Sequence, residues 1–330
     1  MDDPFKTISD YICVDEAHPR NIILIAGATA SGKSSIAISL ANKFDGVIIN
    51  ADSMQVYKEM QIISARPTSE EEAQAEHRMF GHMSAADAYS VGHWLDQVLV
   101  EIVDVLRQGR VPIIVGGTGL YFSALVDGIS PIPTINADIR QFWRDEAALG
   151  NNEKFHNQLM QIDVPLAARL EINDVQRITR GLEVFHSTGR SLSDWQQNEP
   201  LKQFLPNIPG LNLHKFKLQP ERQYLYDRIN ERFDIMVQMG GVKEVEDLMA
   251  MGLPADMTAL KAIGVRQINQ ALIGNMSMDD AIEKSKTESR RYAKRQMTWQ
   301  KGNLITYNSV FEQDMEIKSS FFLSKIIISA

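Results

Sequence analysis

Short apolar runs alternate with helical patterns along the first third of the chain. The run at 21–26, NIILIA, is rich in β-branched residues and ends at a glycine-rich loop, which predicts a buried strand of a parallel sheet. From Lys33 to Phe44 apolar residues recur at helical spacing, and Gly46 separates this helix from a second predicted strand at 47–50. The order strand, loop, helix, strand indicates an α/β core.

This alternation continues for one more unit and then changes. A helical pattern at 92–107 is followed by a predicted strand at 111–115, which runs into the turn Gly116-Gly117-Thr118-Gly119. After the prolines of 130–133, helical periodicity extends from 138 to about 195 without a convincing strand. We therefore expect a mostly helical insertion in the α/β core.

The last third of the chain is predominantly helical. One strand is predicted at 213–218, and helical patterns follow at 224–239, 242–251 and 278–299. The predicted organisation is a first part of the core at 1–130, a helical insertion domain at 131–198, and a mostly helical second part of the core at 199–330. For the apolar end at 321–330 a strand and a helix are both open.

Composition narrows the class of protein. With 44% apolar and 23% charged residues, the chain is typical of a globular protein rather than a disordered or fibrous one. Its single cysteine, Cys13, excludes an intramolecular disulfide and a cysteine-rich zinc site. The acidic beginning does not look like a targeting segment and no apolar run is long enough to cross a bilayer, so we expect a cytoplasmic protein without membrane association.

Charge is unevenly distributed. The net charge of −8 argues against general attraction to nucleic acid, but the stretch 284–301, KSKTESRRYAKRQMTWQK, is strongly basic. Within it, Arg291, Lys294 and Arg295 lie at helical spacings of three and four, which makes contact with phosphates plausible.

The strongest motif is GATASGKS, which follows the first predicted strand and opens a helix. In such a P-loop, glycines allow backbone N–H groups to converge on phosphate oxygens, the lysine adds a cation, and the final hydroxyl reaches Mg²⁺. The pattern predicts a P-loop NTPase-like core, a parallel sheet flanked by helices, that binds phosphates. The predicted phosphate-binding residues are Gly27, Ala28, Thr29, Ala30, Ser31, Gly32, Lys33 and Ser34, with Ser34 as a ligand of Mg²⁺.

A carboxylate follows the second predicted strand. Asp52 stands at the carboxyl end of a parallel strand, where open α/β sheets bind their ligands. Position alone leaves two interpretations open, a catalytic role or an N-cap, because Asp52 and Ser53 also suit the start of a helix at 54–57.

Seven strings in this order, GATASGKS, INADSMQVY, ISARPT, VGGTGLYF, QRITRGLEVFHSTG, LKAIGVRQ and RRYAKRQMTW, resemble the tRNA dimethylallyltransferase family of bacterial type. The resemblance covers nearly the whole chain. It implies transfer of a dimethylallyl group from dimethylallyl diphosphate to N6 of the adenosine 3′-adjacent to the anticodon, in tRNAs that read codons beginning with U. The anticodon stem-loop of tRNA would be the partner, the P-loop would hold a diphosphate, Mg²⁺ would be the cofactor, and the enzyme would act as a monomer.

The resemblance also implies roles for single residues. Asp52 matches the general base of the family, Thr29 lies at a position near the diphosphate, and Thr118 matches a position that contacts tRNA and that we count with the catalytic residues. Arg232 matches a diphosphate-binding arginine; the alternative is an ion pair on a helix surface with Asp234 or Asp227.

Further positions match tRNA contacts of the family. They are Asp52, Ser53, Met54, Gln55, Thr118, Arg140, Gln176, Arg177, Ile178, Thr179, Arg180, Lys261, Ala262, Ile263, Gly264, Val265 and Arg266. Arg177 and Arg180 are three apart and so share one helix face. A surface helix with ion pairs to Glu171, Asp174 and Glu183 is the alternative for these two arginines.

Four positions depart from the family pattern. Ala28 stands where the family usually has proline, Arg66 where it has lysine, Gly81 where it has aspartate, and Val265 where it has tyrosine. We expect little effect of Ala28, because no phosphate-binding N–H group is lost. The others put local substrate or RNA contacts in doubt.

Two other functions share parts of these patterns. An ATP-dependent small-molecule kinase would have the same P-loop, Mg²⁺ and catalytic aspartate. A P-loop RNA-binding regulator would bind nucleotide and RNA without modifying the RNA.

Overall fold

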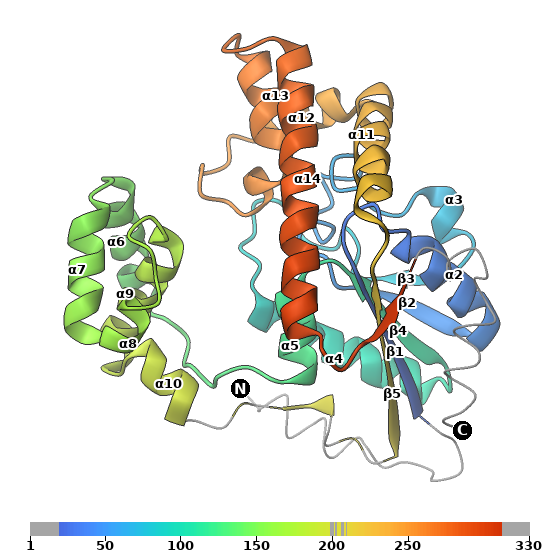
Figure 1. The fold of residues 1–330 in the computed structure, drawn as a ribbon, viewed down its shortest axis with the longest axis horizontal. Coiled ribbons are helices and arrows are strands. Elements are labelled where there is room, and N and C mark those ends of the chain that lie inside the picture. Colours follow the sequence, from blue (N-terminus) through green and yellow to red (C-terminus); the bar gives the residue numbers. More distant parts are fainter. Residues whose placement is uncertain (1–19, 199–200, 202, 206–207, 209, 312–330) are drawn as a thin grey trace. The chain divides into compact units, whose positions relative to one another are not determined.

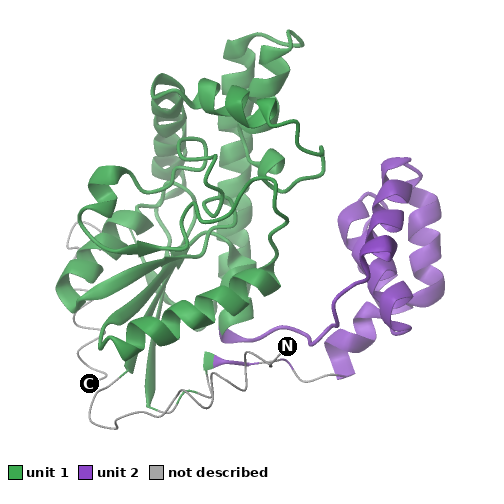
Figure 2. Cartoon of the chain, turned by 180° about the vertical axis from the view of Figure 1, so that it is seen from behind, with its two compact units in different colours: residues 1–125, 205–330 green, residues 126–204 purple. Residues whose placement is uncertain are grey.

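A computed structural model describes residues 20–198, 201, 203–205, 208 and 210–311 of the chain. It divides into two compact units, residues 126–204 and the remainder (Figure 2). We describe each unit separately. The predicted element at 321–330 lies outside the described residues.

A parallel sheet of six strands forms the centre of the larger unit (Figure 1). Its order is β3-β2-β4-β1-β5-β6, and every neighbouring pair is parallel. The strands are β1 (Arg20–Gly27), β2 (Gly46–Asn50), β3 (His77–Arg78), β4 (Val111–Gly116), β5 (Leu211–Leu218) and β6 (Asn308–Val310). The four strands expected from the sequence are confirmed. We did not predict β3 and β6, because two or three residues are too short to show a periodicity.

The helices of the larger unit surround this sheet and extend beyond it. They are α2 (Lys33–Phe44), α3 (Ser69–Glu72), α4 (Val91–Arg107), α5 (Gly119–Val126), α11 (Arg222–Gln238), α12 (Gly241–Ala250), α13 (Val265–Leu272) and α14 (Met278–Asn303), with a 3₁₀ turn at Ala259–Lys261. The predicted helices at 33–44, 92–107, 224–239, 242–251 and 278–299 are confirmed within a few residues. Helices α3, α5 and α13 are additional.

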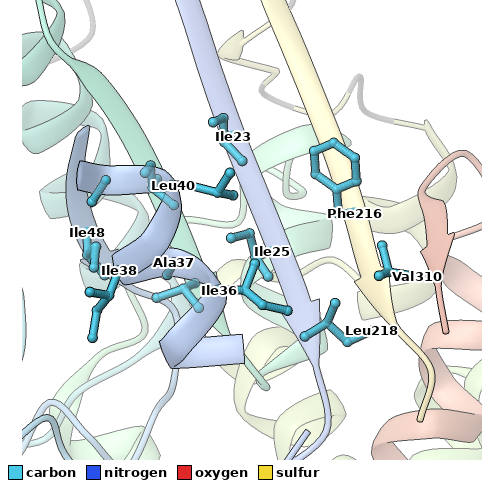
Figure 3. Packing of buried hydrophobic residues seen from close by; sticks show 13 residues of the cluster. Ile23, Ile25, Ile36, Ala37, Ile38, Leu40, Ile48, Phe216, Leu218 and Val310 are labelled. Carbon is cyan, nitrogen blue, oxygen red and sulfur yellow. The ribbon is translucent and has the colours of Figure 1, made fainter. Parts of the chain in front are cut away.

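Helix α2 covers one face of the sheet. Its residues Ile36 and Leu40 pack against Ile23 and Ile25 of β1 (Figure 3). Residues Ile22 and Leu24 alternate with these and are equally buried. Since successive side chains of a strand point to opposite faces, both faces of β1 are covered, as expected of a parallel sheet.

A second apolar cluster fixes the segment that follows β2. Val56, Tyr57 and Met60 are fully buried against Phe233 of α11 and other apolar residues of α11 to α13. The segment has turns rather than a helix. The carboxyl edge of the sheet is therefore attached to α11 through packing, not through one continuous element.

The elements named in the smaller unit are all helices. It contains α6 (Ala137–Ala148), α7 (Asn152–Ile162), α8 (Val164–Ala167), α9 (Val175–Thr188) and α10 (Leu192–Asn198). Its own core includes Trp143, Phe155, Leu159, Ile178 and Leu182. This segment thus has the separate hydrophobic core that a folding unit needs.

Across the described part of the chain, we find no helix that combines the length and the apolar character needed to span a bilayer.

Gly116 permits a close approach of two backbones at the edge of the sheet. A Cβ atom there would lie 2.0 Å from the carbonyl oxygen of Ala51. Gly116→Ala should therefore lower the free energy of unfolding by about 1–3 kcal/mol, since backbone cannot move aside easily. Urea denaturation measures the change.

The matched control is Gly302→Ala in α14, where an added Cβ meets nothing within 4 Å. Alanine is the better helix former by about 0.5–1 kcal/mol, so this variant should be as stable as the wild type or more so. Equal stability of the two variants would contradict the steric role of Gly116.

Candidate active site

Three loops meet where neighbouring strands end. The P-loop follows β1, the segment 51–53 follows β2, and the turn 116–119 follows β4. Because β2, β4 and β1 are adjacent and parallel, their carboxyl ends lie at the same edge of the sheet. The fold therefore brings together the sequence-predicted residues Lys33, Asp52 and Thr118.

The P-loop has the backbone shape of an anion site. Gly32 has a φ of 87° and Ala30 a φ of 63°, which is uncommon for a residue with a side chain. Ser31 N–H donates to the Ala28 carbonyl over 3.2 Å, and α2 begins at Lys33. The first N–H groups of a helix have no partner within it, and they attract anions.

Lys33 is a buried cation within this loop. Its side chain is 9% exposed, and Nζ lies 3.5 Å from the Ala28 carbonyl oxygen. Burial lowers the pKa of Lys33 to about 8; the Asp52 carboxylate opposes this shift, and the Arg232 cation adds to it. The pKa thus reports that both charged groups act on Lys33.

Arg232 reaches the same loop from α11. Its guanidinium donates to Oγ1 of Thr29. Burial lowers the pKa of Arg232 to about 10, again against the attraction of Asp52. Within the described residues, the alternative of a surface ion pair for Arg232 is not observed: Asp234 pairs with Lys286 at 2.8 Å, and Asp227 accepts a hydrogen bond from Gln223.

The backbone and one oxygen of Asp52 are fixed by local hydrogen bonds. Its N–H donates to Oδ1 of Asn50 over 2.8 Å, and its own Oδ1 accepts the N–H of Met54 over 3.0 Å. Within the described part of the chain, no hydrogen bond reaches its Oδ2. The helix N-cap interpretation is wrong, because 54–57 is not helical; aspartate caps a turn here with the same chemistry.

Thr118 connects the turn after β4 to the segment after β2. Its Oγ1 accepts the N–H of Ser53 over 2.9 Å. Gln55 points elsewhere, since its Nε2 donates to the carbonyls of Ser64 and Ala65 and so fixes the following loop. Met54 packs at the margin of the apolar cluster around α11 to α13.

The sequence interpretation missed Gln296 and the aromatic residues around Asp52. Gln296 of α14 accepts from the N–H of Thr29 and donates to the carbonyl of Gly117. Burial raises the pKa of Tyr292, and the Asp52 carboxylate raises it further. Gln296 and Tyr292 stand in the string RRYAKRQMTW, but no spacing in it distinguishes them from surface residues.

Tyr121 is the second tyrosine near this carboxylate. It stacks on Trp94 with ring centroids 4.2 Å apart, and Trp94 donates to the carbonyl of Asn50. Burial raises the pKa of Tyr121, and Asp52 is one of the charged groups that add to it. Two buried tyrosines, Tyr121 and Tyr292, thus lie within electrostatic range of the Asp52 carboxylate.

In the smaller unit, the residues that match tRNA contacts of the family are partly exposed and partly buried. Arg177 and Gln176 are exposed on α9, and Arg180 and Arg140 are partly exposed, whereas Ile178 and Thr179 point into the core of the unit. The side chains of these two residues are therefore not available to an RNA strand.

Ion pairs accompany the arginines. Arg177 pairs with Asp174 at 3.0 Å, and Arg180 pairs with the buried Glu183 at 3.5 Å. Arg144 of α6 shares Glu183 at 3.7 Å. Two of the ion pairs expected for a surface helix, Arg177–Asp174 and Arg180–Glu183, are thus present. Both arginines also keep part of their surface exposed.

The segment 261–266 divides in the same way. Lys261 and Arg266 are exposed, Ile263 is partly exposed, and Ala262 and Val265 are buried in the apolar cluster around α11 to α13. Gly264, also buried, has a φ of 100°. In the basic stretch of α14, Arg291 pairs with Glu288, and Arg295 lies over the ring of Tyr292.

Comparison with known proteins identifies a family. The family described as IPP transferase matches residues 55–303. The tRNA dimethylallyltransferase of Agrobacterium fabrum is 46% identical over 278 residues, which are 84% of this chain and 92% of that protein. The enzyme of the same name from Parvibaculum lavamentivorans is 41% identical over 304 residues, 92% of this chain and 95% of the relative.

Solved structures agree with this. The tRNA isopentenylpyrophosphate transferase of Bacillus halodurans superposes with a TM-score of 0.64 at 30% identity, covering 94% of this chain and 99% of that one. A eukaryotic dimethylallyltransferase, captured acting on tRNA, has a TM-score of 0.74 at 27% identity, covering 88% and 74%. The P-loop NTPase-like core is therefore shared.

The low pKa of Lys33 predicts how anion binding depends on pH. Only the protonated lysine attracts an anion, and the protonated fraction of Lys33 falls to one half near pH 8. The dissociation constant of an alkyl diphosphate should rise above pH 8, approaching a tenfold increase per pH unit, as calorimetric titration would show.

Two variants isolate this effect. Lys33→Met should bind weakly at every pH and lack the added slope, whereas Lys43→Met, at an exposed position near the end of α2, should behave as the wild type. A wild-type slope in Lys33→Met would mean that another group titrates.

Proposed function

The chain belongs to the tRNA dimethylallyltransferase family, and from this premise we infer that its active site transfers a dimethylallyl group from dimethylallyl diphosphate to tRNA. The acceptor we propose is N6 of the adenosine 3′-adjacent to the anticodon. The observation that carries the proposal is the placement of one carboxylate, Asp52, in electrostatic range of two cations, the buried Lys33 and the partly buried Arg232.

The cations account for the leaving group. As the C1–O bond of dimethylallyl diphosphate breaks, the diphosphate keeps the electron pair and negative charge develops on it. Lys33, Arg232 and the N–H groups at the start of α2 would stabilise that charge, because they are fixed in place before the reaction. Low solvent exposure strengthens each of these interactions.

The carboxylate accounts for the acceptor. N6 of adenine forms the new bond to C1 and must lose a proton, which Asp52 would accept at the oxygen that Met54 does not occupy. Thr118 and Ser53 lie next to Asp52 and would help to position the base. Since the adenosine is stacked in the anticodon loop, it must be flipped out to reach this carboxylate.

Mg²⁺ fits this site only with few protein ligands. No group of three or more His, Cys, Asp or Glu side chains within the described residues is placed to hold a metal. The hydroxyl of Ser34 is exposed at the start of α2, so Ser34 would hold the ion together with oxygens of the substrate and water. The bound ion would add positive charge against the departing diphosphate.

Exposed cations support the interaction with tRNA. Arg177 and Arg180 on α9, Lys261 in the 3₁₀ turn before α13, and Arg266 on α13 offer charge to a phosphate backbone. We propose that these side chains, with Arg140, hold the anticodon stem-loop. Because P-loop, base and Arg232 all belong to one chain, we further propose a monomeric enzyme, acting in the cytoplasm.

The experiment that tests the reaction offers both donor types to the purified enzyme. Labelled dimethylallyl diphosphate and unmodified tRNA should give labelled tRNA, whereas ATP with small metabolites should give no phosphoryl transfer. Phosphoryl transfer without prenylated tRNA would favour the kinase, and binding of tRNA without either reaction would favour the regulator.

Asp52→Asn should lower turnover by roughly two to four orders of magnitude, which is the usual contribution of a general base. Asparagine retains the Oδ1 acceptor for the Met54 N–H, so the turn stays intact while the basic oxygen is lost. Single-turnover prenylation measures the rate, and filter binding should show little change in tRNA affinity.

The control for this variant is Asp247→Asn, an exposed carboxylate on α12 that pairs with Lys243. It should react at the wild-type rate. Near-normal turnover of Asp52→Asn would show that the proton goes elsewhere.

Arg180→Ala, and separately Arg177→Ala, should weaken tRNA binding and reduce the dependence of log Kd on log salt concentration by about one unit of slope per lost phosphate contact. Binding of dimethylallyl diphosphate should not change.

Arg169→Ala is the matched control in the same unit, because among the described residues this exposed arginine donates only to the carbonyl of Pro165. If Arg177→Ala and Arg180→Ala bind tRNA as the control does, their ion pairs with Asp174 and Glu183 are purely structural.

A further inference from the structure

We propose that Gln296 is a positioning residue, which sets the distance between the P-loop and the turn that carries Thr118. The inference rests on the proposed function, since it assigns the P-loop to the diphosphate and Asp52 to the acceptor. Gln296 itself need not touch either substrate.

One side-chain amide bridges two loops of the active site. Oε1 of Gln296 accepts the N–H of Thr29 over 2.9 Å, and Nε2 donates to the carbonyl of Gly117 over 2.8 Å. Gln296 is 7% exposed, so water does not readily replace these partners. Because one partner is a donor and the other an acceptor, only one orientation of the amide satisfies both.

On the P-loop side, Gln296 acts together with Arg232. Thr29 is held by its N–H to Gln296 and by its hydroxyl to Arg232, from two different helices. The N–H of Thr29 is therefore already in use. The diphosphate would bind to the N–H groups that follow it, and their position depends on where Thr29 is held.

On the other side, the bridge continues to the base. Gly117 precedes Thr118, whose hydroxyl accepts the N–H of Ser53 next to Asp52. A Cβ atom at Gly117 would lie 2.3 Å from Nε2 of Gln296, so the absence of a side chain permits the contact. Gln296 thus stands between the leaving-group loop and the segment that carries the base.

Helix α14 keeps the amide from shifting. Tyr292 stands one turn before Gln296, and the Gln296 side chain is near enough to lower the pKa of Tyr292 against the rise that burial causes. Trp299, nearly one turn later, lies so close to Gly119 that a Cβ atom there would meet the indole at 2.2 Å. Misplacement of reacting groups by about 1 Å can cost a hundredfold in rate, which makes a rigid spacer at this point functionally important.

The test replaces Gln296 with methionine, which has a similar length but neither bonds the Thr29 N–H strongly nor donates to Gly117. For Gln296→Met we expect the dissociation constant and KM of dimethylallyl diphosphate to rise roughly tenfold, as for a lost hydrogen bond that leaves a buried group unpaired. Turnover should fall about 10- to 100-fold, while KM for tRNA stays within about twofold.

Gln300→Met is the matched control. This residue lies one turn further along α14, is 2% exposed, and belongs to neither loop contact. It should retain wild-type KM and turnover. A purely structural role of Gln296 would lower the amount of folded enzyme and its melting temperature without raising KM. A higher KM for dimethylallyl diphosphate in Gln296→Met than in Gln300→Met therefore decides in favour of the positioning role.

A second variant reaches the same bridge from the other side. Gly117→Ala should displace Nε2 and reproduce the increase in KM, and the two substitutions together should cost less than the sum of their effects, because both break one contact. Wild-type values for Gln296→Met, or equal losses in Gln296→Met and Gln300→Met, would overturn the proposal.

The binding measurement distinguishes a failure of this proposal from a failure of the proposed function. Calorimetric titration with dimethylallyl diphosphate needs no tRNA and no turnover. If the wild type fails to prenylate tRNA, the proposed function fails. If Gln296→Met binds the diphosphate as tightly as the wild type does, the positioning role fails.

Discussion

An excess of positive charge, largely shielded from solvent, at the carboxyl edge of the sheet is the constraint on which the active site depends. Lys33 and Arg232 are both in surroundings that lower their pKa, and Asp52 is the carboxylate that opposes the shift in both. Two cations against one carboxylate leave the site short of negative charge. The diphosphate that we propose as the ligand would supply it, so the site would be organised for its ligand before the ligand arrives, and electrostatic catalysis depends on this.

The fold holds these charges with very few atoms. Backbone contact at Gly116, the hydrogen bond from Ser53 to Thr118, and the bridge of Gln296 join three loops that are distant in sequence. Each of these contacts depends on a missing side chain or on one or two hydrogen bonds. The three loops are positioned by specific hydrogen bonds and close backbone contacts rather than by a large apolar area. The apolar area lies between α2 and the sheet.

Sequence patterns predicted the helices and strands whose apolar residues recur at regular spacing. They did not identify side chains whose hydrogen-bond partners are distant in the sequence. Helix α2 was located to its end residues, because its apolar positions and the glycines around it are local signals. Gln296 was missed because its partners lie 267 and 179 residues away. At Asp52, helix cap and turn share one hydrogen-bond pattern, so sequence could not separate them. The motif around Arg177 likewise did not show that Ile178 faces the core.

Arg66 and Gly81, two of the positions that the sequence comparison marked as departures from the family pattern, lie in close contact. Arg66 donates to the carbonyl of Tyr57, and a Cβ atom at Gly81 would lie 2.0 Å from its guanidinium, so any side chain at 81 would displace the arginine. Both positions adjoin Gln55, whose amide donates to the carbonyl of Ala65 and whose own carbonyl accepts the N–H of Gly81. Asp52 is held separately, through Asn50. This pair therefore adjoins Gln55, which we propose as a tRNA contact, and makes no contact that fixes Asp52.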